Sequence, residues 1–461
     1  MTERVVVVGG DAGGMSAAAQ LRRLRPEDEL EIVVFERGRF TSYAACGLPY
    51  VVGGEVDDTD ELIARTPEQF RRSGIDARTE HEVTAIDTDG RTVTVLDRVS
   101  GDTITQGYDE LLLATGASPV RPPLPGIDAA GVFDLRTIPD AQAVDSAAAG
   151  AERAVVVGAG YIGLEVAEAL RHRGLDVTVI EMAAQPMVTL DADMAEHVVA
   201  ALDRLGVQLR CKEAVEGFET DGDGRVRAVR TAGGTVDADM VVVGLGARPN
   251  VALAEAAGVP LGPTGAIAVD RRMRTRTDGV WAAGDCVESL HRVSQRPVHI
   301  ALGTHANKQG RVAGTNLGGG HAGFDGVLGT AITRVGDAEV ARTGLNEAEA
   351  RDAGFDVVTG GNTASTRARY FPGRADAVVK LVVDRGSGRL LGGQIVGGEG
   401  AGKRIDVIAT ALWNEMHVDD LAGMDLAYAP PFSPVWDPVL SAAGRTADTL
   451  ASQRASARSS K

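Results

Sequence analysis

The sequence predicts an α/β protein in which two nested Rossmann-like dinucleotide-binding folds are combined with a C-terminal α+β domain. The first indication is a buried apolar strand, a glycine-rich turn and a helix, a pattern that occurs at residues 4–21 and again at 154–165. The second is a change beyond residue 326 to strand-like runs at 377–383 and 390–396 and an amphipathic helix at 404–416. With 461 residues, the chain is long enough for three domains of about 100–200 residues each.

The composition disfavours several classes of protein. A formal net charge of −17 argues against nucleic acid and anionic membranes as partners, so an anionic ligand needs a local basic patch. No run reaches the roughly 18 apolar residues that span a bilayer, and the first strand starts too close to residue 1 to leave room for a signal peptide. Three cysteines make no disulfide framework. We expect a cytoplasmic protein, and no metal site is predicted.

The first glycine turn has most of the features of a dinucleotide fingerprint. Strand 5–8 leads to Gly9 and Gly14, and strand 31–35 ends in Glu36. Such a turn brings backbone N–H groups and a helix N-terminus to a pyrophosphate, and the acid accepts ribose hydroxyls. Asp11 replaces the middle glycine, so a purely structural glycine-rich turn remains the alternative.

The second turn has the complete fingerprint. Gly158, Gly160 and Gly163 have the required spacing, and strand 176–180 ends in Glu181. Proteins with two dinucleotide sites commonly hold one bound flavin and one exchanging nicotinamide. The alternative is a pair of Rossmann folds without ligands.

Two later segments are expected to return to the first fold. Strand 111–113 ends in the small turn Ala114-Thr115-Gly116, and an apolar strand near 280 delivers Asp285, an acid suited to the ribityl chain of a flavin. The two nucleotide domains are then nested. The predicted domains are 1–118 with 248–320 for FAD, 119–247 for NAD(P)H, 325–445 for the C-terminal domain and 446–461 as a flexible tail.

A third glycine-rich segment, at residues 397–403, resembles a phosphate-binding loop without meeting all its requirements. Residues 397–403 match the phosphate-binding pattern G-x-x-x-x-G-K between a strand and a helix. That loop requires a Ser or Thr hydroxyl next, and this chain has Arg404. We therefore expect no phosphate loop here.

Cys46 is the candidate redox residue. It follows the first ribose-binding acid closely and is flanked by Gly47 and Pro49, where a flavin ring would lie. A cysteine against a flavin can attack a disulfide as its thiolate. No second cysteine lies within five residues, so the partner sulfur comes from a substrate, or Cys46 forms a sulfenate. A small buried hydrophobe is the alternative, and Cys211 and Cys286 are predicted to be structural.

Several motifs occur together in a characteristic order, at residues 42–50, 114–116, 158–165, 244–250 and 283–285. In this set the chain resembles the pyridine nucleotide-disulfide oxidoreductases over about residues 3–445, and within them the single-cysteine branch of coenzyme A-disulfide reductases and NADH oxidases. The resemblance implies FAD and NAD(P)H as cofactors. It also implies a homodimer in which the C-terminal dimerisation domain completes the partner's active site.

The resemblance also implies cofactor-binding residues. For FAD they are Gly9, Ala12, Gly14, Glu36, Arg37, Val83, Ala114, Thr115, Gly116 and Asp285, and for the nicotinamide Gly158, Gly160, Ile162, Gly163, Glu165, Glu181 and Gly246. The carboxylate of Glu181 repels a 2′-phosphate, and the next four residues contain no Arg or Lys to neutralise one. We therefore expect NADH to be preferred over NADPH. Glu165 is expected near the contact between nicotinamide and flavin.

The catalytic and substrate-binding residues are also carried over from the resemblance. Tyr370 and Tyr428 match two tyrosines that act from the dimer partner, where a phenol can protonate a leaving thiolate; interface packing is the alternative for both. Substrate contacts map to Ser16, Gln20, Arg23, Ser42 and His305. The first three of these are spaced i, i+4, i+7 and share one helix face, which could grip a phosphate or be an ordinary solvated face. His305 is a ligand contact or a structural histidine.

Three individual positions help to choose between the reactions known in this branch. Ala12 replaces a histidine usual in NADH oxidases and peroxidases, which favours the coenzyme A-disulfide type. Ala45 and Trp436 replace an Asn and a Lys of that type and leave smaller disulfides and persulfides open. We predict an NADH-dependent flavoenzyme that reduces a small disulfide or persulfide, with coenzyme A (CoA) disulfide favoured, through a mixed disulfide on Cys46. The alternatives are an NADH oxidase that reduces O₂ through a Cys46 sulfenate, an electron-transfer reductase for a small protein, and a redox sensor.

Overall fold

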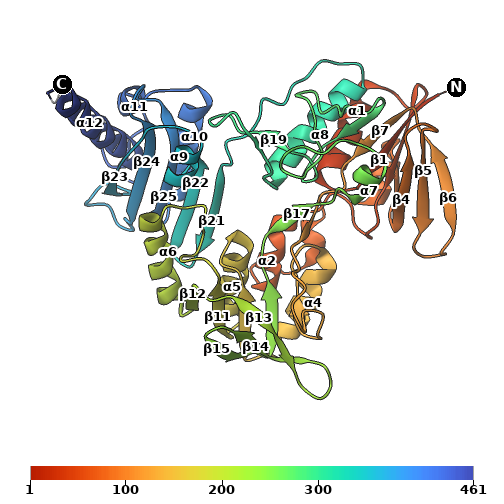
Figure 1. Ribbon diagram of the computed structural model, residues 1–461, viewed down its shortest axis with the longest axis horizontal. Helices are drawn as coiled ribbons and strands as arrows, with labels where there is room; N and C mark the ends of the chain where they lie inside the picture. The colour runs from red at the N-terminus through yellow and green to blue at the C-terminus, as the bar shows by residue number, and fades with distance from the viewer. Residues whose placement is uncertain (1, 460–461) are drawn as a thin grey trace.

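The computed structural model describes residues 2–459, which form three lobes (Figure 1). The first lobe lies on the right in that view and contains the N-terminal strand. The second lies below, and the C-terminal lobe lies on the left. Within residues 2–459 no helix is both long and apolar enough to cross a bilayer.

The first lobe is built on a parallel five-stranded sheet. Its central strands consist of Val, Ile and Leu that are buried on both faces, as in sheets covered by helices. The helices α1 (Ala12–Leu24) and α8 (Gly303–Leu317) pack against each other beside it. In order across the sheet, the strands are β18 (Val280–Ala282), β7 (Glu110–Leu113), β1 (Glu3–Val8), β2 (Leu30–Phe35) and β3 (Asp76–Arg78). The late strand β18 therefore completes the sheet that the N-terminus begins.

The second lobe repeats this arrangement with helix α5 (Tyr161–His172) after its glycine turn. Its parallel strands, in order, are β12 (Gln208–Cys211), β11 (Asp176–Glu181), β10 (Arg153–Val157), β16 (Met240–Val243) and β9 (Val132–Phe133). The chain passes between the two lobes twice, through β8 (Ala117–Pro119) and β17 (Ala247–Pro249), which pair antiparallel. One glycine turn thus lies in each lobe, and the two lobes are joined by this two-stranded connection.

The C-terminal lobe is an antiparallel sheet covered by helices, including α10 (Ile405–Trp413) and α12 (Pro438–Ser459). In order, its strands are β21 (Ala331–Val335), β22 (Ala338–Gly344), β25 (Leu390–Gly397), β24 (Asp376–Asp384) and β23 (Val357–Ser365). The predicted fold class, two nested dinucleotide-binding folds with a C-terminal α+β domain, is confirmed.

The segment predicted to be a flexible tail, 446–461, is helical in the part of it that the structure describes. Helix α12 continues to Ser459, and Thr446 and Leu450 are buried against the C-terminal sheet. The guanidinium of Arg454 donates to the carbonyl oxygens of Arg385 and Gly386. The start of α12 buries Val439, Leu440, Ala442 and Ala443, but among residues 446–455 only Thr446 and Leu450 are buried, so this later part carries little hydrophobic periodicity. Residues 460 and 461 lie outside the described residues.

The glycine-rich segment 397–403 holds an internal carboxylate. The N–H groups of Gly400 and Gly402 donate to Glu339, at 3.0 and 2.6 Å. A side chain of the same domain therefore occupies the donors that a phosphate loop would offer to a nucleotide.

Candidate flavin and nicotinamide sites

The first glycine turn is shaped for close backbone approach. Gly9 has φ +109°, and a Cβ there would overlap the carbonyl oxygen of Ala114. A Cβ on Gly14 would likewise overlap the carbonyl oxygen of Gly9. The turn therefore tolerates only glycine at both positions, and it aims the N-terminus of α1 at the space above it.

That space is a cleft of about 560 Å³, within the range of small-molecule and cofactor sites. The carboxylate of Glu36 lies at its edge and accepts from the N–H groups of Gly10 and Gly38, both at 2.7 Å. Nine of the ten residues predicted for FAD line the cleft: Gly9, Ala12, Glu36, Arg37, Val83, Ala114, Thr115, Gly116 and Asp285. Gly14, the tenth, packs beneath the turn.

Two further residues of the cleft, Arg136 and Asn250, were not predicted to bind the cofactor. Arg136 lies beyond β8 and bonds Asp285 at 3.2 Å. Asn250 follows β17 and exchanges hydrogen bonds with Thr115, of 2.6 and 2.8 Å, which hold the Ala-Thr-Gly turn. Both positions depend on the chain crossing between the lobes; Asn250 ends the motif at 244–250, whereas no local pattern marks Arg136.

Asp11 lies at the position of the missing glycine and lines the same cleft. Its Oδ1 is buried without a hydrogen-bond partner among residues 2–459. Burial raises the pKa of Asp11 to about 6, against the opposing charge of Arg136. A buried polar atom and a cradle that a Cβ would fill both fit a bound dinucleotide at this place.

Asp11 yields a stability prediction for the flavin-free protein. Because its folded pKa of about 6 exceeds the ordinary aspartate value of 3.8, the folded state binds the proton more tightly. Asp11 therefore destabilises the fold increasingly as pH rises from about 4 to 6. We expect Asp11→Asn to be more stable by about 1–3 kcal/mol above pH 6, a difference that shrinks toward pH 4. Urea unfolding across this pH range measures it, and a difference that does not vary with pH would contradict the assignment.

The second turn offers open space at the centre of its fingerprint. Gly158 has φ +103°, and a Cβ there would lie 2.5 Å from the carbonyl oxygen of Gly244. A Cβ on Gly163 would overlap Gly158, whereas none of the surrounding atoms lies within 4 Å of a Cβ built on Gly160 or Gly246. The close contacts fix the turn, and the open positions leave room for a pyrophosphate.

The acid after β11 repeats the role of Glu36. Glu181 accepts from the N–H groups of Ala159 and Ala183, at 2.8 and 2.7 Å. At the start of α5, Ile162 presents an apolar side chain that is 43% exposed. All seven residues predicted for the nicotinamide therefore belong to this turn, to α5 or to the ends of β11 and β16.

Cys46 belongs to a short 3-10 helix, Ala45–Gly47, that leads into α2 (Leu48–Val52). The residue is exposed, and the charges that act on its thiol are those of Glu165, Arg136, Asp285 and Asp11. Three of these line the flavin cleft, and Glu165 lies on α5. Desolvation by the surrounding protein raises the pKa of Cys46 most, and the negative charge of Glu165 raises it further. The positive charge of Arg136 lowers it. Tyr43 lines the flavin cleft, and Pro49 and Tyr50 lie beside Glu165 of α5, so the segment that carries the thiol runs between the two predicted cofactor sites.

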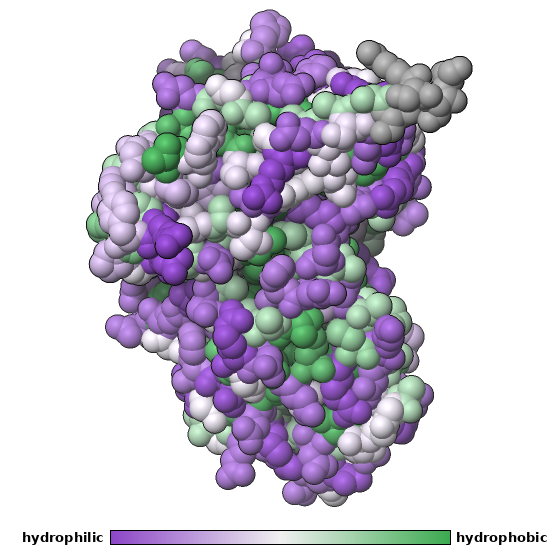
Figure 2. All heavy atoms as spheres, turned by 90° about the vertical axis from the view of Figure 1, so that its left-hand side faces the viewer, coloured by the Kyte–Doolittle hydropathy of each residue, from purple (hydrophilic) through white to green (hydrophobic). Residues whose placement is uncertain are grey.

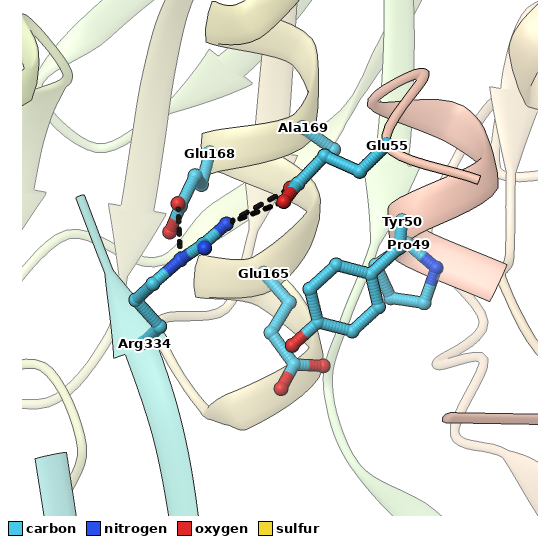
Figure 3. A pocket seen from close by; sticks show the side chains of 7 residues that line it. All are labelled: Pro49, Tyr50, Glu55, Glu165, Glu168, Ala169 and Arg334. Carbon is cyan, nitrogen blue, oxygen red and sulfur yellow. Dashed lines mark hydrogen bonds and ion pairs between the residues drawn. The ribbon is translucent and has the colours of Figure 1, made fainter. Parts of the chain in front are cut away.

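The neighbourhood of Glu165 joins all three lobes (Figure 3). The Oγ1 of Thr333 donates to Glu165 at 2.8 Å, and burial raises the pKa of Glu165. Arg334, from β21, bonds both oxygens of Glu55 at 2.9 Å and Glu168 at 3.1 Å. These bonds fix α2, which follows Cys46, against α5.

The predicted substrate residues all belong to the first lobe. Ser16 donates to the side-chain oxygen of Asn307 at 2.7 Å, which joins α1 to α8. Gln20 and Arg23 continue that face of α1. Ser42 has φ +49° and donates from its backbone N–H to Gly10. The remaining residue, His305, is half-buried at the start of α8, and burial lowers its pKa.

Tyr370 and Tyr428 lie in a different part of the molecule, on the C-terminal lobe. They are 77% and 49% exposed, and Tyr370 helps to raise the pKa of Tyr428, after desolvation. Phe432 and Trp436 are 75% and 69% exposed nearby in sequence. Figure 2 looks onto the side of the molecule on which the C-terminal lobe lies, and apolar side chains appear there among hydrophilic ones. The structure therefore does not bring either tyrosine to Cys46 within one chain.

The fold and the two glycine turns define an oxidoreductase with one flavin-type and one nicotinamide-type site. The family model "Pyridine nucleotide-disulphide oxidoreductase" matches residues 3–310, and the dimerisation-domain model of that family matches residues 330–438. The chain belongs to the pyridine nucleotide-disulphide oxidoreductase family. Membership implies FAD and NAD(P)H as cofactors, and the dimerisation domain supports a homodimer.

Several relatives match along nearly their full length. A protein of Methanocaldococcus jannaschii named NADH oxidase is 38% identical, covering 95% of this chain and 98% of the relative. An NAD(P)H coenzyme A polysulfide/persulfide reductase of Pyrococcus horikoshii is 40% identical, with 95% and 97% covered. A coenzyme A disulfide reductase of Staphylococcus epidermidis is 33% identical, with 93% and 96% covered. The crystal structure of reduced Bacillus anthracis CoADR-RHD superimposes with a TM-score of 0.94 at 35% identity, covering 98% of this chain and 81% of that one.

Proposed function

We propose that the protein is an FAD-dependent NADH reductase of small disulfides or persulfides, with CoA disulfide as the favoured substrate. The observation that supports it best is the single exposed thiol of Cys46 between the two cofactor sites. Of the other two cysteines, Cys211 ends β12, and Cys286 is buried and donates to the carbonyl oxygens of Leu113 and Ala283. Neither is placed to pair with Cys46, so the second sulfur comes from a substrate.

In the proposed reaction, the cofactors supply the electrons, and side chains supply the sulfur nucleophile and the proton. Bound FAD would pass two electrons from NADH to sulfur. The Cys46 thiolate attacks R–S–S–R, forms Cys46–S–S–R and releases RS⁻, which takes a proton from a phenol. Two electrons and a proton then reduce the mixed disulfide to the thiolate and RSH. The role of Arg136 is to favour the thiolate, because its charge lowers the pKa of Cys46.

The two tyrosines require a second copy of the chain. Tyr370 and Tyr428 are exposed on the lobe that matches the dimerisation domain, far in the fold from the elements that carry Cys46. In the proposed dimer, these phenols approach the partner's Cys46 and protonate the leaving thiolate. The same face carries the exposed Phe432 and Trp436, which favour burial against another protein surface.

The face shared by α1 and α8 supports an anionic substrate. These helices pack so closely that a Cβ on Gly310 would overlap Gly13. Because Ser16 bonds Asn307, the next turns place Gln20 beside Arg311. Arg23, Lys308 and Arg311 are exposed there, and none forms an ion pair within residues 2–459. In a chain of net charge −17, three free cations at one place fit the phosphates of CoA.

NADH oxidase activity is the second candidate. Its support is the M. jannaschii relative of that name, and O₂ would be reduced through a sulfenate on Cys46. Ala12 lines the flavin cleft without a polar side chain, so this position offers no proton donor for peroxide chemistry.

Two measurements test the proposal. Mass spectrometry of the unreduced protein should find a CoA adduct on Cys46. Anaerobic NADH oxidation should depend on CoA disulfide and be slower with cystamine, a disulfide without phosphates. Turnover that requires O₂ and ignores CoA disulfide would favour the oxidase instead.

Glu181 gives a prediction for the nicotinamide site. Glu181→Ala removes the acceptor of the ribose hydroxyls, and we expect kcat/KM for NADH to fall about tenfold. The ratio of NADPH to NADH efficiency should rise, because the repulsion of a 2′-phosphate is lost. Asp176→Ala, at the other end of β11, is the matched control. Unchanged efficiency with NADH in Glu181→Ala would show that the ribose does not bind there.

A further inference from the structure

A lysine lies beside the nicotinamide site without a role in the proposed reaction. Lys212 directly follows β12, and the sheet register places its neighbour Cys211 opposite Glu181. The backbone N–H of Lys212 donates to the carbonyl oxygen of Ala183 at 2.8 Å. The lysine is therefore held against the loop that follows the ribose-binding acid, although 31 positions separate Glu181 from Lys212 in the sequence.

The backbone of Lys212 is fixed while its charge is free. Its φ of +58° is a left-handed conformation that lysine rarely adopts. The side chain is exposed, and its ammonium makes no ion pair or hydrogen bond within residues 2–459. The nearest acid in sequence, Glu213, is already paired with Arg210 at 2.8 Å. An unneutralised ammonium thus stands at the edge of the ribose site.

We propose that Lys212 sets the tolerance of this protein for NADPH by binding the 2′-phosphate that Glu181 repels. The inference rests on the proposed function, because it takes the adenosine ribose to bind at Glu181. A phosphate at the 2′ position adds negative charge beside a carboxylate, and a cation within reach offsets that repulsion. NADH then remains the better donor, and NADPH is accepted because of Lys212.

The test compares Lys212→Ala, Lys212→Glu and Lys212→Arg as flavin-containing proteins. Stopped-flow reduction of the flavin by NADH and by NADPH measures each donor without any disulfide substrate. For NADPH, we expect the efficiency to fall about fivefold in Lys212→Ala and about 20-fold in Lys212→Glu, and to be retained in Lys212→Arg. For NADH, it should stay within about twofold. Added salt should slow NADPH more than NADH in the parent protein and equally in Lys212→Ala.

Arg225→Ala is the matched control, because Arg225 is exposed and unpaired within residues 2–459 and lies at the far end of the β13–β14 hairpin (Val215–Thr220 and Val226–Thr231). Equal NADPH-to-NADH ratios in the parent, Lys212→Ala and Lys212→Glu overturn the inference, as does a parent protein that NADPH does not reduce. The Glu181→Ala variant distinguishes failure of the inference about Lys212 from failure of the proposed ribose site. If it weakens NADH while the Lys212 variants change nothing, only this inference fails; if it also changes nothing, the proposed ribose site fails.

Discussion

Cys46→Ser is expected to abolish disulfide reduction and to leave the flavin in place. The serine hydroxyl cannot form a mixed disulfide, so anaerobic NADH oxidation driven by CoA disulfide should fall by about 10³-fold or more. Reduction of the flavin by NADH should continue, because this step precedes the one that uses the Cys46 sulfur. Steady-state assays measure the first effect, and stopped-flow absorbance measures the second.

Cys211→Ser is the control for this experiment, since Cys211 lies at the end of β12 and not beside α2. Full activity in Cys46→Ser would contradict the proposal and indicate an electron-transfer reductase that uses a small protein acceptor. A parent protein that binds NADH tightly and turns over negligibly would instead indicate a redox sensor. The combination of an inactive Cys46→Ser with an active Cys211→Ser supports chemistry at one sulfur.

The features that could be predicted from the sequence are those formed by residues close together in the chain. A strand, a glycine turn and an acid at the end of the next strand are consecutive in the chain, so Gly9, Glu36, Gly158 and Glu181 could be assigned without knowledge of the fold. The structure adds the reason for the glycines, because a Cβ on Gly9 would overlap the backbone of Ala114. These positions are constrained by close backbone contacts, and such constraints leave a sequence signature.

Contacts between distant segments left no such signature. Arg136 reaches Asp285 across 149 positions, and Lys212 meets Ala183 only because β12 is the neighbour of β11. The continuation of helix α12 was missed for a different reason, since Leu450 is the one buried apolar side chain among residues 446–455, which otherwise resemble a polar tail in sequence.

Free cations provide a physical link between the sites. Within residues 2–459 many arginines pair with carboxylates, and the exposed ones that do not include some away from any proposed ligand, such as Arg72 and Arg225, and several at the proposed ligand sites. Within residues 2–459, Arg37 and Arg248 line the flavin cleft, Lys212 borders the nicotinamide site, and Arg23, Lys308 and Arg311 lie on the α1–α8 face, all without an ion pair. Each group lies where a phosphate-bearing ligand is proposed. Leaving these cations unpaired keeps them available for phosphates, which a surface of net negative charge otherwise repels.

Gly9→Ala tests the flavin cleft independently of the sulfur. Alanine at φ +109° is strained, and its methyl group would displace the carbonyl oxygen of Ala114. Together these effects cost about 2–4 kcal/mol. We expect flavin binding to weaken by about 30- to 1,000-fold, so that the purified variant is nearly colourless and has a lower Tm. The ratio of flavin to protein absorbance and thermal unfolding measure the two effects.

Gly150→Ala is the control for the glycine substitution, because no atom lies within 4 Å of a Cβ built there and φ is not positive. It should keep its flavin and its Tm. Gly9→Ala with a full complement of flavin would show that the cleft at the first turn does not hold the isoalloxazine-bearing cofactor. Because Cys46→Ser should be yellow and inactive while Gly9→Ala should be folded and colourless, the pair separates loss of the sulfur chemistry from loss of the cofactor that supplies it.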